Sequence, residues 1–231
     1  MSHTPSPGVP VLRLAGVSKA YSGSNKSGRT VLKSVSYDFE EGRMYSISGP
    51  SGSGKTTLLS LAGGLDSPSS GTISFRGRDL GDLGLANYRR RHAATVFQSL
   101  NLLTYMSAVQ NITSAMEITG THIPRRKQKA EDLLEMLGIA PQDRHRKTLQ
   151  LSGGQQQRVA IARAMACRVD ILLADEPTGS LDHDTAGEII EVFRKLAHED
   201  GKCVIIVTHS REVANASDEA LCLKRGALKS Q

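Results

Sequence analysis

The sequence has no tryptophan, few aromatic residues and only three cysteines. Cys167, Cys203 and Cys222 lie far apart and form no C-x-x-C pair, so we expect reduced cytosolic thiols and neither a disulfide framework nor a metal site. No apolar run approaches the roughly 20 residues that span a bilayer. The first ten residues, MSHTPSPGVP, lack the apolar core of a signal peptide. We therefore expect a soluble, cytoplasmic chain that reaches a membrane only through a partner.

The charge excess is also small. The chain of 231 residues carries 29 basic and 23 acidic side chains, which gives a formal net charge of +6. Scattered charge of this size permits an acidic ligand or a nearby membrane surface, but it does not require nucleic acid, and we expect no nucleic-acid partner. Because 39% of the residues are hydrophobic, the chain can bury a core, which excludes global disorder.

The apolar pattern predicts an α/β protein. Strands are expected at 11–21, 31–40, 43–49, 71–77, 170–177 and 202–209, with a terminal hairpin at 219–229. Helices are expected at 54–65 and 185–200, and the chain from about 87 to 167 is expected to be mostly helical, with helices at 107–118, 126–139 and 153–166. The continuous apolar runs at 170–177 and 202–209 are typical of strands buried in a parallel sheet.

The stretch GPSGSGKTT (49–57) separates a predicted strand from a predicted helix. It fits the pattern G-x-x-x-x-G-K-[ST], in which backbone amides surround phosphate oxygens and so need residues with little side-chain bulk. The following helix points its positive end at the anion. Lys55 supplies a point charge, and the hydroxyl of Thr56 can bind Mg²⁺. The alternative, a flexible turn, would need neither the lysine nor the hydroxyl.

A second element, ILLADE, ends an apolar strand with Asp175 and Glu176. In open α/β sheets, ligands bind at the carboxyl ends of strands. Asp175 could hold Mg²⁺ there, directly or through water, and Glu176 could polarise an attacking water. Alone, the pair would indicate only a solvated turn.

A third element, LSGGQQQR (151–158), opens a predicted helix, with Ser152 as its expected N-cap. Its glycines expose amides at a helix N-terminus and so predict a second anion site. Two phosphate sites with one lysine indicate that each holds half of a shared nucleotide. The alternative is an ordinary capped helix.

Together these motifs give a specific resemblance, from about Val11 to Lys229, to the ATP-binding subunits of ABC transporters. GPSGSGKTT matches the Walker A loop, LSGGQ the signature and ILLADE the Walker B strand. Gln98 in VFQ matches the Q-loop residue, Asp182 in GSLD the D-loop and His209 in VTH the switch histidine. Tyr21 matches the aromatic residue that stacks on adenine.

The resemblance implies a P-loop NTPase of the ABC ATPase type, with a central, mainly parallel sheet, an N-terminal antiparallel β subdomain and a helical insert subdomain. It implies a flexible tail at 1–10 and one domain at 11–231. The RecA-like core would cover about 11–90 and 168–231, and the helical subdomain about 91–167. It also implies a head-to-tail homodimer around two ATP molecules, attached to the cytoplasmic face of the cell membrane through a transmembrane permease.

The resemblance further implies ATP and Mg²⁺ as cofactors. The ATP-binding residues would be Tyr21, Gly49, Pro50, Ser51, Gly52, Ser53, Gly54, Lys55, Thr56, Thr57, Ser152, Gly153, Gly154, Gln155 and Asp182. The magnesium ligands would be Thr56, Gln98 and Asp175, and the catalytic residues Glu176, His209 and Gln98. Read alone, Gln98 could cap a strand, and His209 and Tyr21 could be ordinary core residues. The basic stretch PRRKQK (124–129) is interpreted as a solvated helix start.

A finer resemblance points to the ATPases of macrolide export, lipoprotein release and antimicrobial-peptide resistance, through the segments 49–66, 96–112 and 178–185. One departure is Gln110, where that group usually has an acidic residue. Export or release of a peptide, lipoprotein or drug-like cargo is therefore expected, and the rival is a cell-division ATPase of the same group, which acts on a membrane partner without transport. Chromosome-maintenance and translation-factor ATPases are disfavoured because the chain has one cassette and no long coiled coil.

Overall fold

The computed structural model describes residues 10–21, 29–120 and 124–231. The expected tail therefore lies outside the described residues, apart from Pro10. No helix in the described ranges is long and apolar enough to cross a bilayer.

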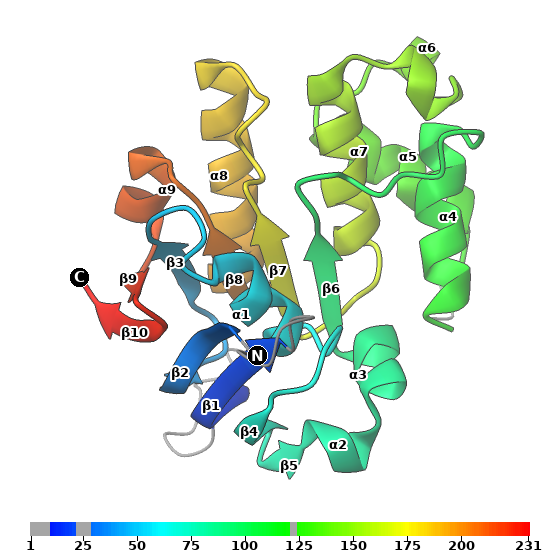
Figure 1. Ribbon diagram of the computed structural model, residues 1–231. Helices are drawn as coiled ribbons and strands as arrows, with labels where there is room; N and C mark the ends of the chain where they lie inside the picture. Colours follow the sequence, from blue (N-terminus) through cyan, green and yellow to red (C-terminus); the bar gives the residue numbers. More distant parts are fainter. Residues whose placement is uncertain (1–9, 22–28, 121–123) are drawn as a thin grey trace.

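The larger of two sheets has six strands in the order β10-β9-β3-β8-β7-β6 (Figure 1). These strands are β3 (Met44–Ser48), β6 (Ala93–Val96), β7 (Ile171–Asp175), β8 (Cys203–Val207), β9 (Glu219–Lys224) and β10 (Ala227–Ser230). All neighbouring strands are parallel except β9 and β10, which form the predicted terminal hairpin. Every residue of β7 and β8 is buried, which explains their unbroken apolar sequences. The predicted mainly parallel sheet is confirmed.

The smaller sheet is antiparallel and has the order β2-β1-β4-β5. Its strands are β1 (Leu12–Tyr21), β2 (Arg29–Phe39), β4 (Ser70–Phe75) and β5 (Arg78–Asp79). Its apolar side chains share one hydrophobic core with helix α1 (Lys55–Ala62) and with residues of β3, β7 and β8. This sheet confirms the predicted N-terminal antiparallel subdomain, and its core holds α1 against the central sheet.

A second core joins the central sheet to helices α4 (Ala108–Ile118), α5 (Arg126–Met136), α7 (Gly153–Met165) and α8 (His183–His198). Figure 1 shows α4, α5 and α7 grouped on one side of the molecule, together with α6 (Pro141–Arg144). The remaining helices are α2 (Leu80–Leu83), α3 (Leu85–Arg91), α9 (Arg211–Ala216) and a short 3-10 helix at Thr148–Gln150. Residues 124–129 are exposed at the start of α5, as predicted for a solvated helix start.

Strand β6 lies inside the range predicted for the helical subdomain. It pairs in parallel with β7 through Ala93–Ile171 to Val96–Ala174, so it belongs to the central sheet. The predicted boundary near residue 91 is therefore too early. The helical subdomain, which contains α4 to α7, begins only after Val96.

The departure at Gln110 has a local explanation. Ser107 is the N-cap of α4, and its hydroxyl accepts a hydrogen bond from the backbone N–H of Gln110 at 3.2 Å. The side-chain oxygen of Gln110 accepts one from the N–H of Ser107 at 2.9 Å. This reciprocal arrangement is a capping box, which glutamine and glutamate complete equally well. The glutamine therefore preserves the start of the helix.

Candidate functional site

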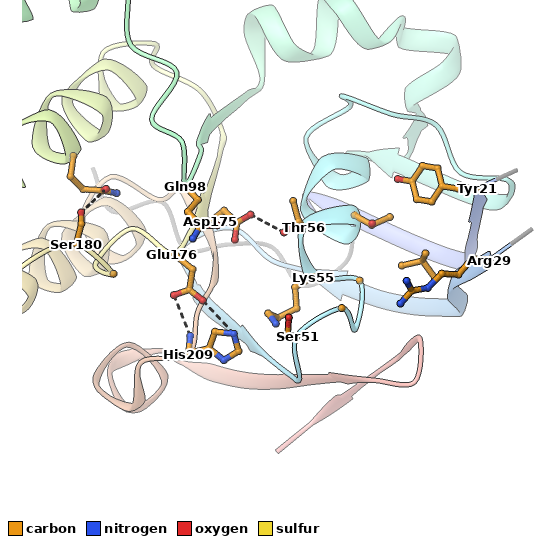
Figure 2. A pocket seen from close by; sticks show the side chains of 16 residues that line it. Tyr21, Arg29, Ser51, Lys55, Thr56, Gln98, Asp175, Glu176, Ser180 and His209 are labelled. Atoms are coloured by element: carbon orange, nitrogen blue, oxygen red, sulfur yellow. Dashed lines mark hydrogen bonds and ion pairs between the residues drawn. The ribbon is translucent and has the colours of Figure 1, made fainter. Parts of the chain in front are cut away.

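Four parallel strands end at one edge of the central sheet, where they deliver the glycine-rich loop and three polar side chains. Gly49 directly follows β3, Gln98 lies just beyond β6, Glu176 directly follows β7 and His209 lies just beyond β8. Ligands of open α/β sheets bind at such an edge. The described residues form a cavity of about 830 Å³ there (Figure 2). It is lined by Tyr21, Arg29, Val31, Ser51, Gly52, Gly54, Lys55, Thr56, Thr57, Gln98, Gln157, Asp175, Glu176, Gly179, Ser180 and His209.

The glycine-rich loop between β3 and α1 needs glycine for steric reasons. Gly49 has φ of 151°, and a Cβ built there would lie 2.2 Å from the carbonyl oxygen of Leu223. Gly54 has φ of 102°, and its Cβ would lie 2.7 Å from a methyl carbon of Val31. Both approaches are too close for any side chain, so the loop conformation depends on the absence of a Cβ.

Lys55 lies beneath this loop and is only 9% exposed. Its ammonium donates hydrogen bonds to the carbonyl oxygens of Gly49 at 2.7 Å and Pro50 at 3.2 Å. An ammonium group has three N–H donors, so one remains for an anion in the cavity. These two hydrogen bonds hold the side chain of Lys55 in position at the N-terminus of α1. The helix dipole also favours a bound anion at that place.

The pair Thr56 and Asp175 joins the start of α1 to the end of β7. The Thr56 hydroxyl donates a hydrogen bond to Oδ2 of Asp175 at 3.0 Å, which brings two oxygen ligands together (Figure 2). No group of three His, Cys, Asp or Glu side chains within the described ranges could hold a metal by itself. A site with so few protein oxygens fits Mg²⁺, which keeps several waters and binds phosphate oxygens as its other ligands.

Glu176 has an acceptor oxygen to spare. Its Oε2 accepts hydrogen bonds from the Thr208 hydroxyl and from the backbone N–H of His209, both at 3.3 Å. Its Oε1 is buried, has no hydrogen-bond partner among the described residues and lies 3.8 Å from Nε2 of His209. A buried carboxylate oxygen without a donor is costly, so this atom is suited to receive a hydrogen bond from a water in the cavity.

Three alternatives from the sequence fail against this geometry. The side chain of His209 is 61% exposed, so it is not a core histidine. Tyr21 is 45% exposed and lines the cavity, so it is not a core tyrosine. Its hydroxyl donates to Asp66 at 3.3 Å, and the ammonium of Lys19 lies 5.1 Å from the ring centre. Gln98 lines the cavity. Its side chain has no hydrogen-bond partner among the residues that the structure describes, so it does not cap a strand.

Several predicted binding residues do not line the cavity of their own chain. They are Gly49, Pro50, Ser53, Ser152, Gly153, Gly154, Gln155 and Asp182. Ser152 is the N-cap of α7 and forms a capping box with Gln155, whose amide also donates to Asp143 at 2.9 Å. Asp182 is the N-cap of α8, and the hydrogen bond that its carboxylate accepts from the N–H of Thr185, at 3.0 Å, lowers its pKa.

Three polar residues of the cavity wall, Arg29, Gln157 and Ser180, were not among the predicted site residues. Arg29 begins β2 in a part of the chain without a motif. Gln157 follows the LSGGQ segment and is only 3% exposed. Its Oε1 accepts a hydrogen bond from the Ser180 hydroxyl at 3.3 Å, the dashed line that ends on Ser180 in Figure 2. Its Nε2 is buried and has no hydrogen-bond partner in the described part of the chain. The repeated glutamines after LSGGQ were the only available signal for Gln157.

Known proteins resemble this chain in sequence. The family model described as ABC transporter matches residues 32–179. YclH of Bacillus subtilis, described as an uncharacterized ABC transporter ATP-binding protein, is 48% identical over 203 residues, 88% of this chain and 89% of the relative. The macrolide export ATP-binding/permease protein MacB 2 of Aeromonas hydrophila is 41% identical over 223 residues, 95% of this chain but only 34% of the relative.

Two solved structures of the cassette MJ0796, from Methanocaldococcus jannaschii, have the same fold. One is described as the dimeric structure of a bacterial ABC transporter cassette, and it aligns with a TM-score of 0.90 and 37% identity over 95% of this chain and 97% of that one. The other, a dimeric post-hydrolysis state bound to ADP and Pi, aligns with a TM-score of 0.90, 36% identity and the same coverage.

Proposed function

The chain belongs to the ABC transporter ATP-binding family, and from this premise we propose that it binds and hydrolyses ATP, dimerises on ATP and drives a separate membrane permease. One observation carries the proposal. The pairs Thr56–Asp175 and Glu176–His209 line one cavity together with Lys55. That arrangement supplies a phosphate site, oxygen ligands for Mg²⁺ and a carboxylate for water.

The chemistry follows from the positions of these side chains. The amides of the loop and the ammonium of Lys55 bind the β- and γ-phosphates. Bound Mg²⁺ would neutralise phosphate charge, held by Thr56, Asp175 and Gln98. Oε1 of Glu176 accepts a hydrogen bond from the attacking water and polarises it for attack on the γ-phosphate. His209 lies beside that carboxylate, with Nε2 3.8 Å from Oε1, and lines the same cavity, where it would contact the γ-phosphate.

The position of the signature residues supports a shared site. Ser152 and Gly153 are exposed at the N-terminus of α7 and do not line the cavity of their own chain. Exposed amides at a helix N-terminus bind anions well. They would reach a γ-phosphate only if a second copy of the chain brought them to it. The solved relatives are described as dimeric cassettes, in agreement with a head-to-tail pair.

Exposed apolar side chains just before α4 and in the 3-10 helix Thr148–Gln150 support a membrane partner. Tyr105 is 67% and Leu149 is 71% exposed. The segments that carry them are joined, because the N–H of Thr148 donates to the carbonyl of Met106 at 3.1 Å. Exposed apolar groups in contiguous positions mark interaction surfaces. We place the permease on this surface and the chain on the cytoplasmic face of the membrane.

The cargo is proposed from the relatives. The MacB relatives are described as combined ATP-binding/permease proteins, and this chain spans about a third of their length. Export or release of a peptide, lipoprotein or drug-like molecule is therefore proposed for the assembled transporter. Purification with the membrane partner tests this, because a partner without transport activity would favour the cell-division role instead.

The variant Glu176→Gln tests the hydrolytic site. It keeps the loop, Lys55 and the Thr56–Asp175 pair but replaces the polarising carboxylate by an amide. We expect ATP affinity within about threefold of the parent and a loss of turnover of at least about a hundredfold. Phosphate release and direct ATP titration are the measurements. Turnover close to the parental rate would exclude Glu176 as the catalytic carboxylate, and a parent that neither binds nor hydrolyses ATP would contradict the proposed function.

A further inference from the structure

Arg29 is a cation in the wall of the cavity that no motif includes. It is the first residue of β2, and it lines the cavity together with Tyr21 and Val31. Figure 2 shows its guanidinium between Tyr21 and the glycine-rich loop. A Cβ built on Gly52 would lie 3.6 Å from Nη2 of Arg29, so the guanidinium lies against the backbone of that loop.

The charge of Arg29 has no partner within the part of the chain that the structure describes. None of the ion pairs or side-chain hydrogen bonds found there includes it, and the sequence between Tyr21 and Arg29, SGSNKSG, contains no acidic residue. The acidic residues of the cavity wall already have partners. Asp175 accepts from Thr56, and Glu176 accepts from Thr208 and lies beside His209. The guanidinium is therefore available to an anion that enters the cavity.

We infer that Arg29 binds the α-phosphate of the nucleotide, an inference that rests on the proposed function. Tyr21 marks the base end of the cavity, and Lys55 marks the end that receives the β- and γ-phosphates. Arg29 lies between them, beside Gly52. A guanidinium presents paired N–H donors that match two phosphate oxygens, which makes arginine suited to this position.

The contact predicts a particular kinetic pattern. ATP and ADP both carry an α-phosphate, and that group does not react. Arg29 therefore strengthens the binding of substrate, product and transition state alike. Loss of such uniform binding raises KM and leaves kcat unchanged.

The test is a titration of the chain of 231 residues with Mg²⁺–ATP and Mg²⁺–ADP, for the parent and for Arg29→Ala and Arg29→Lys. We expect Arg29→Ala to weaken both nucleotides by a similar factor, about five- to twentyfold at low salt, and by less as salt screens the charge. Arg29→Lys keeps the charge but not the paired donors, so it should recover only part of the loss. ATP turnover should show a raised KM and a kcat within about twofold of the parent.

Lys33→Ala is the matched control, because Lys33 is exposed on the same strand and does not line the cavity. It should bind both nucleotides as the parent does. Parental affinity in Arg29→Ala would overturn the inference, as would a loss confined to ATP or an equal loss in Lys33→Ala. In those cases the parent still binds ATP and the proposed function stands. A parent without ATP affinity would overturn both.

Discussion

At the scale of single residues, Lys55 already has two hydrogen-bond partners before any anion arrives. Its ammonium bonds to the carbonyls of Gly49 and Pro50, and its side chain is almost completely buried. The loop is thus folded around its own lysine. A phosphate that enters the cavity meets a charge that is already in place, which reduces the entropy lost on binding.

Lys55→Ala should therefore have two effects. ATP affinity should fall by at least about a hundredfold, because the phosphates lose a charge-assisted donor. The free energy of unfolding should fall by about 1–3 kcal/mol, because two carbonyls lose their donor. Direct nucleotide titration and denaturant unfolding measure the two effects. Parental ATP affinity in a folded variant would contradict the phosphate site.

The sequence predicted those site residues that stand at fixed spacings next to predicted strand ends. Lys55, Asp175 and His209 meet because parallel strands end at the same edge of a sheet. Arg29 could not be predicted in this way, because its place beside Gly52 depends on how the antiparallel sheet packs against α1. Gln157 could not be predicted either, because its burial depends on the neighbouring loop and not on its own helix.

At the scale of elements, Gln157 connects helix α7 with the loop that follows Glu176. It does so through the hydroxyl of Ser180, which lies in that loop. The same helix begins with the residues Ser152 and Gly153, so one side chain links the first turns of α7 to the loop that follows the end of β7. The side-chain amide of Gln157 has no acceptor among the residues that the structure describes, and a buried N–H without an acceptor costs about 1–3 kcal/mol.

Gln157→Met should separate this link from that cost. The methionine fills a similar volume without a buried amide, so we expect the free energy of unfolding to change by less than about 1 kcal/mol. ATP turnover at saturating ATP should fall severalfold, because the loop after Glu176 loses its bond to α7. Gln156→Met is the control, since the Gln156 amide bonds to the carbonyl of Leu151 outside the cavity. Equal turnover in the two variants would contradict this role of Gln157.

Most elements were predictable because their apolar residues form a clear pattern, either a continuous run in a buried strand or a helical period. Strands β7 and β8 and helix α8 are the clearest cases, and all three lie where they were expected. Strand β6 is the exception among the central strands, because its four residues lie at the edge of the sheet and are too short for a periodic signal. Its pairing with β7 is a long-range contact, which no local pattern contains.

At the scale of the whole molecule, the proposed function gives each chain half of two sites. Its cavity holds Lys55, and its exposed α7 terminus holds Ser152 and Gly153. A head-to-tail pair would bring each terminus to the other chain's cavity. The activity of the chain should therefore depend on its concentration or on a permease that holds two copies together.

A mixture of two inactive variants tests this arrangement. Lys55→Ala breaks the cavity, and Gly153→Asp adds a carboxylate at the signature that would repel the γ-phosphate. Gly153 is the better choice for this change because its Cβ would meet none of the described atoms outside its own helix within 4 Å, whereas at Gly154 it would lie 3.3 Å from Leu181. Each site of a mixed dimer combines the cavity of one chain with the α7 terminus of the other. One site therefore contains both changes, and the other site contains neither. We expect ATPase activity that neither variant shows alone.

The dimer itself can be observed without turnover. With ATP, Glu176→Gln should accumulate as a dimer, measured by light scattering, while the protein without nucleotide stays mainly monomeric. A variant that stays monomeric at high concentration, and again beside its permease, would contradict the shared site.

We expect natural selection to act differently on Gly49 and Gly153. A side chain at position 49 would collide with the carbonyl of Leu223, so alleles that change it are lost through misfolding, whatever the protein does. Position 153 has open space, and a single chain would fold with alanine there. If a population still purges variants at Gly153, the constraint must come from another molecule. Comparing mutational tolerance at these two sites therefore separates selection on folding from selection on assembly.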